Sequence, residues 1–260
     1  MPDDNFGDWR IAMVTTLAED QPAAYPGGPS HRAGTPVYIS NILQHKALGN
    51  LGFVSPHPTA LALSVAIRHS RSAIEISKRL SYKDNVTPWG GGKLIPDSDL
   101  PLLYDFFEHN MIVVAFSFQA IEAFANSVIS RHPNRKIKIR RKKGIVEIDS
   151  SDAERNLSTE EKLAKVLPFL LAIPNPSGKK IWVKFKKLKD VRDTTIHFKS
   201  EDMFTKHKVD TDSLYYHFFD TNPLAFVSTA YEVIKYFLIP RDYPRWFIEF
   251  QNIHGKELSL

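Results

Sequence analysis

Apolar side chains recur at intervals of three and four positions in several stretches of the chain, a spacing that gathers them on one face of an α-helix. The clearest stretch spans residues 180–197, where lysines occupy much of the other side. Its apolar positions are Ile181, Phe185, Leu188 and Val191. The same periodicity predicts further helices over residues 58–80, 97–130, 158–173 and 224–238. We therefore expect an all-α helical bundle of about five helices.

The stretch 97–130 is apolar on nearly every side, which predicts a helix at the centre of the bundle. It is also long enough to cross a membrane. Glu122 and Asn126 lie near its middle, however, and a carboxylate at the centre of a bilayer is costly. The acidic N-terminus also lacks the apolar run of a signal peptide. We expect a buried helix in a cytoplasmic protein, without a membrane partner.

The two ends of the chain lack helical periodicity. Residues 1–58 contain seven of the seventeen prolines, and proline interrupts helices. They are expected to form an irregular N-terminal segment, either an ordered wrap or a flexible lead-in. Residues 241–260 form an aromatic tail that is either a strand or a packing arm. The expected division is therefore the segment 1–58, a helical domain over 59–240 and the tail 241–260.

Residues 131–143 form the most basic segment, with eight Lys or Arg in thirteen positions. Lysine and isoleucine alternate from Lys136 to Ile139. Residues 144–148, after a basic turn, have the pattern of a second, pairing strand. This pattern predicts a small basic β-hairpin inserted into the bundle. An ordinary solvated hairpin is one interpretation. The density of charge fits better an arm that follows nucleic-acid phosphates.

Composition removes several kinds of site. The 260 residues are 43% hydrophobic and carry a net charge of +5, enough for a folded core with a mild basic excess. Because cysteine is absent, disulfides, thiolate zinc sites and cysteine nucleophiles are excluded. The glycine run 90–92 does not complete a phosphate-binding loop, since Thr87 and Leu94 occupy positions that require glycine and Ser or Thr. No metal site and no cofactor are expected.

One charged residue falls on the apolar stripe of the helix over 180–197. At about 100° per residue, Arg192 lies directly above Leu188. Burying an unpaired charge costs several kcal/mol. The Arg192 guanidinium must therefore pair with a carboxylate or a phosphate, or lie in a cleft that water enters. Glu122, with Asn126 one turn on, is favoured as a buried structural hydrogen bond or ion pair; if Arg192 faces the core, Glu122 is its most economical partner within the chain. Asp193 and His197 share the neighbouring face of the helix.

These features together resemble the HEPN superfamily of helical-bundle proteins, which includes prokaryotic toxins, abortive-infection proteins and CRISPR-associated ribonucleases. The resemblance lies in the apolar helix containing SFQAIEAFANSVI, the basic excursion after it, and the basic helix ending in RDTTIH. Arg192 and His197, with four residues between them and the polar Asp193 after the arginine, match the family motif at its short end. The resemblance covers roughly residues 60–240.

The resemblance implies a homodimeric, metal-independent endoribonuclease in a toxin–antitoxin or phage-defence system, with an antitoxin protein as a possible partner. His197 would act on the attacking 2′-hydroxyl or the leaving 5′-oxygen, and Arg192 would hold the phosphate. Asp193 could orient His197. Glu122 and Asn126 would position the arginine. The residues expected to bind RNA are Arg135, Lys136, Lys138, Arg140, Arg141, Lys142, Lys143, Lys184 and Lys187.

Two other interpretations predict different behaviour. A catalytically silent module of the same fold would bind RNA, a nucleotide or a protein without cleaving RNA. The two differ in whether Arg192 and His197 of two chains meet in an open cleft. A helical DNA-binding protein is a third possibility, although the sequence contains no convincing recognition helix. Residues 1–58 could block the cleft, complete the dimer or recruit a partner.

Overall fold

The computed structural model describes residues 7–87, 90–133, 135–141, 144–198 and 213–259. Of these residues, 56% are helical and 17% lie in strands. The prediction of an all-α bundle of about five helices is therefore wrong, because four two-stranded antiparallel sheets accompany the helices. Helices are present in all five predicted stretches, although that over 158–173 is interrupted, and in the described residues three further α-helices, short 3₁₀ turns and three unpredicted hairpins join them.

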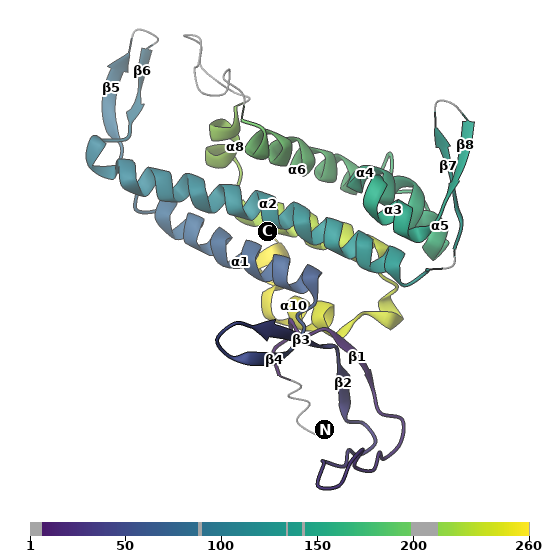
Figure 1. Ribbon diagram of the computed structural model, residues 1–260. Helices are drawn as coiled ribbons and strands as arrows, with labels where there is room; N and C mark the ends of the chain where they lie inside the picture. The colour runs from purple at the N-terminus through teal and green to yellow at the C-terminus, as the bar shows by residue number, and fades with distance from the viewer. Residues whose placement is uncertain (1–6, 88–89, 134, 142–143, 199–212, 260) are drawn as a thin grey trace.

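Helix α2 (Leu100–Ser130) is the centre of the bundle. Helix α1 (Pro58–Ser77) runs beside it, and α6 (Lys180–Ile196) and α9 (Pro223–Phe237) pack on its other sides (Figure 1). Its most apolar window is long and apolar enough to span a membrane, but 56% of that window is buried within the protein. This burial is that of the core helix of a soluble bundle.

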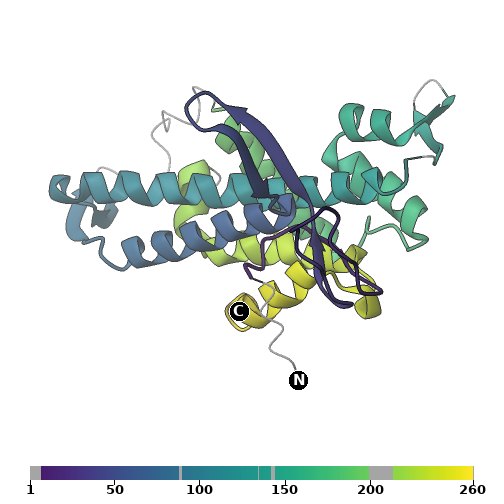
Figure 2. The same ribbon diagram turned by 60° about the horizontal axis from the view of Figure 1, so that its bottom comes forward.

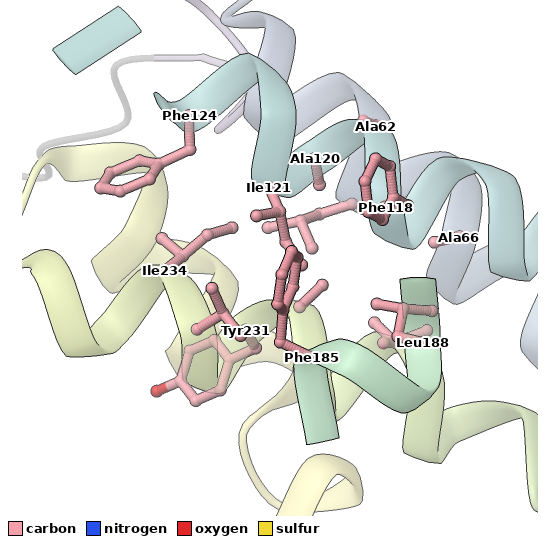
Figure 3. Packing of buried hydrophobic residues seen from close by; sticks show 14 of the residues in the cluster. Ala62, Ala66, Phe118, Ala120, Ile121, Phe124, Phe185, Leu188, Tyr231 and Ile234 are labelled. Atoms are coloured by element: carbon pink, nitrogen blue, oxygen red, sulfur yellow. The ribbon is translucent and has the colours of Figure 1, made fainter. Parts of the chain in front are cut away.

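Small and aromatic side chains set the spacing of the core (Figure 3). Ala62 and Ala66 of α1 are buried against α2, whose own contribution includes Ala120. Such short side chains let two helices approach closely. On the opposite side, Phe118 of α2 stacks on Phe185 of α6, with ring centroids 6.1 Å apart. Helix α2 is therefore packed closely against α1 through alanines and against α6 through aromatic rings.

The predicted helix over 158–173 is interrupted. Ser158 and Glu161 form a capping box at the start of α4 (Thr159–Glu161). A π-helical turn, Lys162–Val166, follows and leads into α5 (Leu167–Leu171). Pro168 has no N–H to donate, so it cannot take part in a regular α-helical ladder at this point. The helix is therefore distorted by a π-turn just ahead of this proline.

Each two-stranded sheet is a separate hairpin. The basic hairpin is present as β7 (Ile137–Arg141) and β8 (Gly144–Ile148). A second hairpin, β5 (Lys83–Thr87) and β6 (Gly90–Leu94), joins α1 to α2. These two hairpins extend from opposite ends of α2 (Figure 1).

The N-terminal segment is not irregular. It contains the paired strands β1 (Met13–Thr16) and β2 (Pro36–Tyr38), followed by the hairpin of β3 (Ser40–His45) and β4 (Gly49–Val54). Both pairs project beside α10 and the start of α1 (Figures 1 and 2). The prolines exclude helix from this segment, but they permit short strands.

Three short helices complete the chain: α3 (Ser150–Asn156), α8 (Leu214–Asp220) and α10 (Arg245–His254). The aromatic tail is thus a helix rather than a strand. Phe247 of α10 is fully buried and stacks on Tyr231 of α9, with ring centroids 5.1 Å apart. This contact makes α10 an integral part of the core.

Candidate nucleic-acid interface

Arg192 lies in the last turn of α6, where the preceding buried residues Phe185 and Leu188 hold the helix against α2. Its guanidinium carbon is 3.8 Å from the centroid of the Phe118 ring. Its Nη1 is 2.9 Å from Oδ1 of Asp193. The side chain keeps 22% of its surface exposed. Arg192 is therefore fixed in place by a cation–π contact and an adjacent carboxylate.

The carboxylate of Asp193 forms ion pairs with two cations of its own helix. Besides Arg192, its Oδ2 accepts a hydrogen bond from Nζ of Lys189 at 2.7 Å. This bond to the carboxylate raises the pKa of Lys189. Asp193 contacts His197 through the backbone, where the His197 N–H donates to the Asp193 carbonyl at 2.9 Å. The expected role of Asp193 in orienting the imidazole is not the geometry found here.

His197 caps the C-terminal end of α6 and is exposed to solvent. Its backbone has left the helical conformation, with φ −114° and ψ 64°. Because its side chain faces water, His197 can exchange protons with a bound substrate.

Glu122 and Asn126 do not meet Arg192. Both instead face Lys162, the first residue of the π-helical turn, which is 98% buried. Its Nζ donates to Oδ1 of Asn126 at 2.8 Å and to the carbonyl of Glu154 at 2.7 Å. Burial lowers the pKa of Lys162, and the carboxylates of Glu122 and Glu154 oppose that shift.

This buried lysine was missed at the sequence level although a signal for it exists. Lys162 shares a helical face with Val166 and Leu170, both of which are buried. A cation on an apolar face requires partners. The same reasoning that singled out Arg192 applies equally to Lys162 and leads to Asn126.

The basic hairpin lies far from the arginine–histidine pair. It stands at the end of the bundle where α3 to α5 gather, whereas α6 ends at the opposite side, next to α8 (Figure 1). Its isoleucines, Ile137 and Ile139, are buried, which turns Lys138 outward. Lys136 pairs with Glu147 at 3.2 Å, and Arg135 is exposed. The side chains of Arg140 and Arg141, and the whole of Lys142 and Lys143, lie outside the described residues.

Carboxylates neutralise several lysines of α6. Lys184 pairs with Glu232 of α9 at 2.8 Å, and Lys186 pairs with Glu160 at 2.9 Å. Lys187 is exposed and, with Lys184, lines a groove of about 220 Å³ between α6 and α9. The positive face of α6 is therefore weaker than its lysine count implies, and Lys187 is its most available charge among those expected to bind RNA.

Within the described residues, no three His, Asp or Glu side chains gather closely enough to hold a metal ion. His69 of α1 and His109 of α2 do form a pair, with their Nδ1 atoms 2.8 Å apart. Two ligands of one tetrahedral zinc ion lie further apart, at roughly 3.3 Å. This distance is that of a hydrogen bond between the two rings, in which one Nδ1 donates and the other accepts.

No known protein family, no curated protein and no solved structure matches this chain. The functional argument therefore depends on the residues of the chain and the contacts they make.

Proposed function

We propose that the protein is a metal-independent endoribonuclease of the HEPN type that acts at Arg192 and His197. The observation that carries this proposal is the end of α6. There an arginine is held rigidly over Phe118 while an exposed histidine caps the same helix one turn later. A positioned guanidinium and a free imidazole are the two groups needed to hold a phosphodiester and to move its protons.

The chemistry follows from the two side chains. The 2′-oxygen of the RNA attacks the adjacent phosphorus, and the 5′-oxygen of the next nucleotide leaves. His197 removes the 2′-proton or supplies the proton that the 5′-oxygen needs, because an imidazole titrates near neutral pH. Arg192 balances the charge that builds up on the phosphoryl oxygens. The products are a 2′,3′-cyclic phosphate and a 5′-hydroxyl.

A homodimer would supply one histidine for each proton transfer. Apolar side chains are exposed around the end of α6, which supports an interface there. They are Ile196, Phe198, Tyr215 and Phe219. Clustered exposed apolar groups are typical of surfaces that bind another protein. Two chains joined at this end would bring their arginine–histidine pairs towards one another.

The same chemistry suggests the biological setting. An RNA-cleaving dimer fits a cytoplasmic toxin or phage-defence protein whose activity an antitoxin restrains. RNA would be held by exposed cations such as Lys187 of α6 and Lys138 of the hairpin.

A second candidate function is a silent RNA-, nucleotide- or protein-binding module. The pairing of Arg192 with Asp193 favours it, because that guanidinium already has a carboxylate as a partner. A phosphate would have to compete with Asp193 for the same donors.

Growth of a bacterial host after induced expression tests the proposal. Wild-type protein is expected to arrest growth, and Arg192→Ala or His197→Ala is expected to relieve the arrest at equal protein level. Arg79→Ala and His45→Ala are matched controls, since both residues are exposed and lie away from α6. Arrest that persists in both test variants would contradict the assigned residues. No arrest by the wild-type protein would favour the binding module.

A further inference from the structure

The hairpin of β3 and β4 carries exposed apolar side chains along its whole length. All residues of both strands are exposed. Single exposed apolar residues are common, but a cluster of them marks a surface that contacts another molecule. In this hairpin and the residue before it, every large apolar side chain is between 38% and 78% exposed: Ile39, Ile42, Leu43, Leu48, Leu51, Phe53 and Val54. The described part of the chain leaves this surface uncovered.

The apolar side chains lie on both faces of the hairpin. Leu43 is directly opposite Leu51, and Phe53 is two residues beyond Leu51, so these three share one face. Ile42 and Val54 lie on the other face, because side chains alternate along each strand. A protein that packs against an antiparallel sheet covers one face and leaves the other in water. Apolar groups on both faces instead fit surroundings that enclose the hairpin.

The base of the hairpin is anchored, whereas its strands project from the bundle (Figures 1 and 2). At the base, the Ala12 N–H donates to the Ser55 carbonyl at 2.9 Å, and the Ser55 N–H donates to the Ile39 carbonyl at 2.7 Å. A cleft of about 1270 Å³ beside the start of α1 separates this base from the bundle. Its walls come from the base of β3 and β4, the start of α1, the C-terminal part of α2, α3 and the residues leading into α10. His57 and Trp246, which both line the cleft, stack with ring centroids 4.9 Å apart.

The tip of the hairpin pairs its own backbone donors. The N–H groups of Ala47 and Leu48 both donate to Nδ1 of His45, each at 3.2 Å. Backbone donors that leave water need an acceptor within the protein, because lipid offers none. Leu48 itself is 68% exposed. The tip therefore presents an aliphatic side chain to its surroundings while two of its backbone N–H groups are satisfied internally.

The charge of this part of the chain has one sign. No Asp or Glu occurs from Gln21 to Ile74, although the chain contains 29 in 260 residues. Lys46 lies in the turn of the hairpin, and Arg32, between β1 and β2, is exposed. An arm that follows nucleic-acid phosphates needs several cations, and this hairpin has a single lysine. Exposed aliphatic groups with a cation and no carboxylate fit the interface of an anionic membrane, where apolar burial and attraction to the lipids add together.

We propose that the tip of the β3–β4 hairpin inserts into the surface of a membrane that contains anionic lipids. The aliphatic side chains of both faces lie between the headgroups and the acyl chains, and Lys46 pairs with the lipid anions. This is a contact with a membrane surface, not a membrane span, and α2 stays in the core of the bundle. The inserted tip is separate from the end of α6 and takes no part in RNA cleavage.

Co-sedimentation of the purified full-length chain with lipid vesicles tests the proposal. The chain is expected to bind vesicles of phosphatidylcholine mixed with phosphatidylserine, and to bind phosphatidylcholine alone more weakly. High salt should weaken binding to the mixed vesicles.

Variants locate the contact. Ile42→Asn combined with Leu48→Asn should weaken binding to the mixed vesicles by about tenfold or more, because two aliphatic groups no longer leave water. Lys46→Glu should weaken binding to the mixed vesicles by about tenfold and leave binding to phosphatidylcholine unchanged. These three side chains are exposed, so the variants should fold. The matched control is Val86→Asn, which removes an 88% exposed aliphatic group from the β5–β6 hairpin and should change nothing.

A fluorescent label reports insertion itself. Because the chain has no cysteine, Ala47→Cys labelled with a polarity-sensitive dye reports on the tip alone. Its emission is expected to shift to the blue with the mixed vesicles, whereas the same label on Val86→Cys should not shift.

Several results would overturn the proposal. They are no binding of the wild type to mixed vesicles, wild-type binding by the double variant, or a tip label that stays in water. Two others would assign the hairpin to a different partner. One is RNA that shifts the tip label when vesicles do not. The other is a wild-type dimer that the double variant dissociates without any change in vesicle binding.

Discussion

The end of α6 and the cleft beside α1 are both polar regions against the central helix α2, but their histidines differ in exposure, since His197 is exposed and His57 is buried. At the end of α6, Arg192 has Phe118 and Asp193 as partners, its Nε is buried without a hydrogen-bond partner among the described residues, and His197 is exposed to solvent. In the cleft, His57 is buried with an unpaired nitrogen. The first region carries a recognisable motif and little enclosure. The second carries enclosure and no motif.

This difference separates two kinds of argument for a site. Residue spacing identified Arg192 and His197, which lie at the exposed end of α6. Geometry identified the cleft, where residues from five parts of the chain converge on one point. A motif therefore indicates chemistry, whereas a buried polar atom without a partner marks a position that needs an explanation.

The largest expected effect concerns the contact that holds α6 in place. Phe185 is fully buried against Phe118 and Trp182. Phe185→Ala should lower the free energy of unfolding by about 3–5 kcal/mol through lost contacts and the cavity left behind. Denaturation with guanidinium measures it. The control is Val183→Ala on the exposed side of the same helix, where a change within about 0.5 kcal/mol is expected. Equal losses at both positions would show that α6 is not anchored as described.

The next effect is the contribution of His57, in the cleft, to the loss of stability at acid pH. The folded-state pKa of His57 is about 4, below the ordinary value of 6.5. Above the ordinary value the imidazole is neutral in both states, so it has no effect on stability. As the pH falls towards 4, His57 becomes protonated in the unfolded chain but stays neutral in the folded chain. His57 should therefore reduce stability by about 3 kcal/mol between roughly pH 7 and pH 4.

Urea denaturation at a series of pH values, comparing the wild type with His57→Phe, measures this contribution. The variant should lose less stability on acidification, and the difference between the two proteins should grow as the pH falls. The comparison is needed because His69 and His254 also have lowered pKa values. Parallel curves for the two proteins would mean that His57 is not held neutral by burial.

The smallest effect concerns the partner of Arg192. A double-mutant cycle on Arg192 and Asp193 should give a coupling of about 0.5 kcal/mol, as expected for a half-exposed pair. The matched cycle on Arg192 and Glu122 should be additive within about 0.3 kcal/mol, because Glu122 faces Lys162 instead. Coupling in the second cycle and none in the first would restore the partner expected from the sequence.

The helical core was predictable because its periodicity was strong. Apolar spacing located α1, α2, α6 and α9. The C-terminal helix was missed although Trp246, Phe250 and His254 recur every four positions and are all buried. The hairpin of β3 and β4 offered no such signal. Its residues are exposed on both faces, so apolar and polar positions do not alternate.

Pairings between distant elements were the least predictable feature. The helical wheel correctly placed Arg192 towards the core, but it does not fix how far α6 slides along α2. That offset decides whether Phe118 or Glu122 lies opposite the arginine, and the structure places Phe118 there. The cleft could not be predicted either, since His57, Asn126 and Trp246 are brought together only by tertiary packing.

Mapping the ends of RNA cleaved by the purified protein in the presence of a chelator tests the ribonuclease assignment most directly. We expect fragments with 2′,3′-cyclic phosphate and 5′-hydroxyl ends. His197→Ala should slow cleavage by roughly 100-fold or more, the range typical of a lost general acid or base. A substrate with a single 2′-deoxynucleotide at the cleaved position should be resistant. Cleavage that His197→Ala leaves unchanged, or no cleavage by the folded wild-type protein, would contradict the assignment.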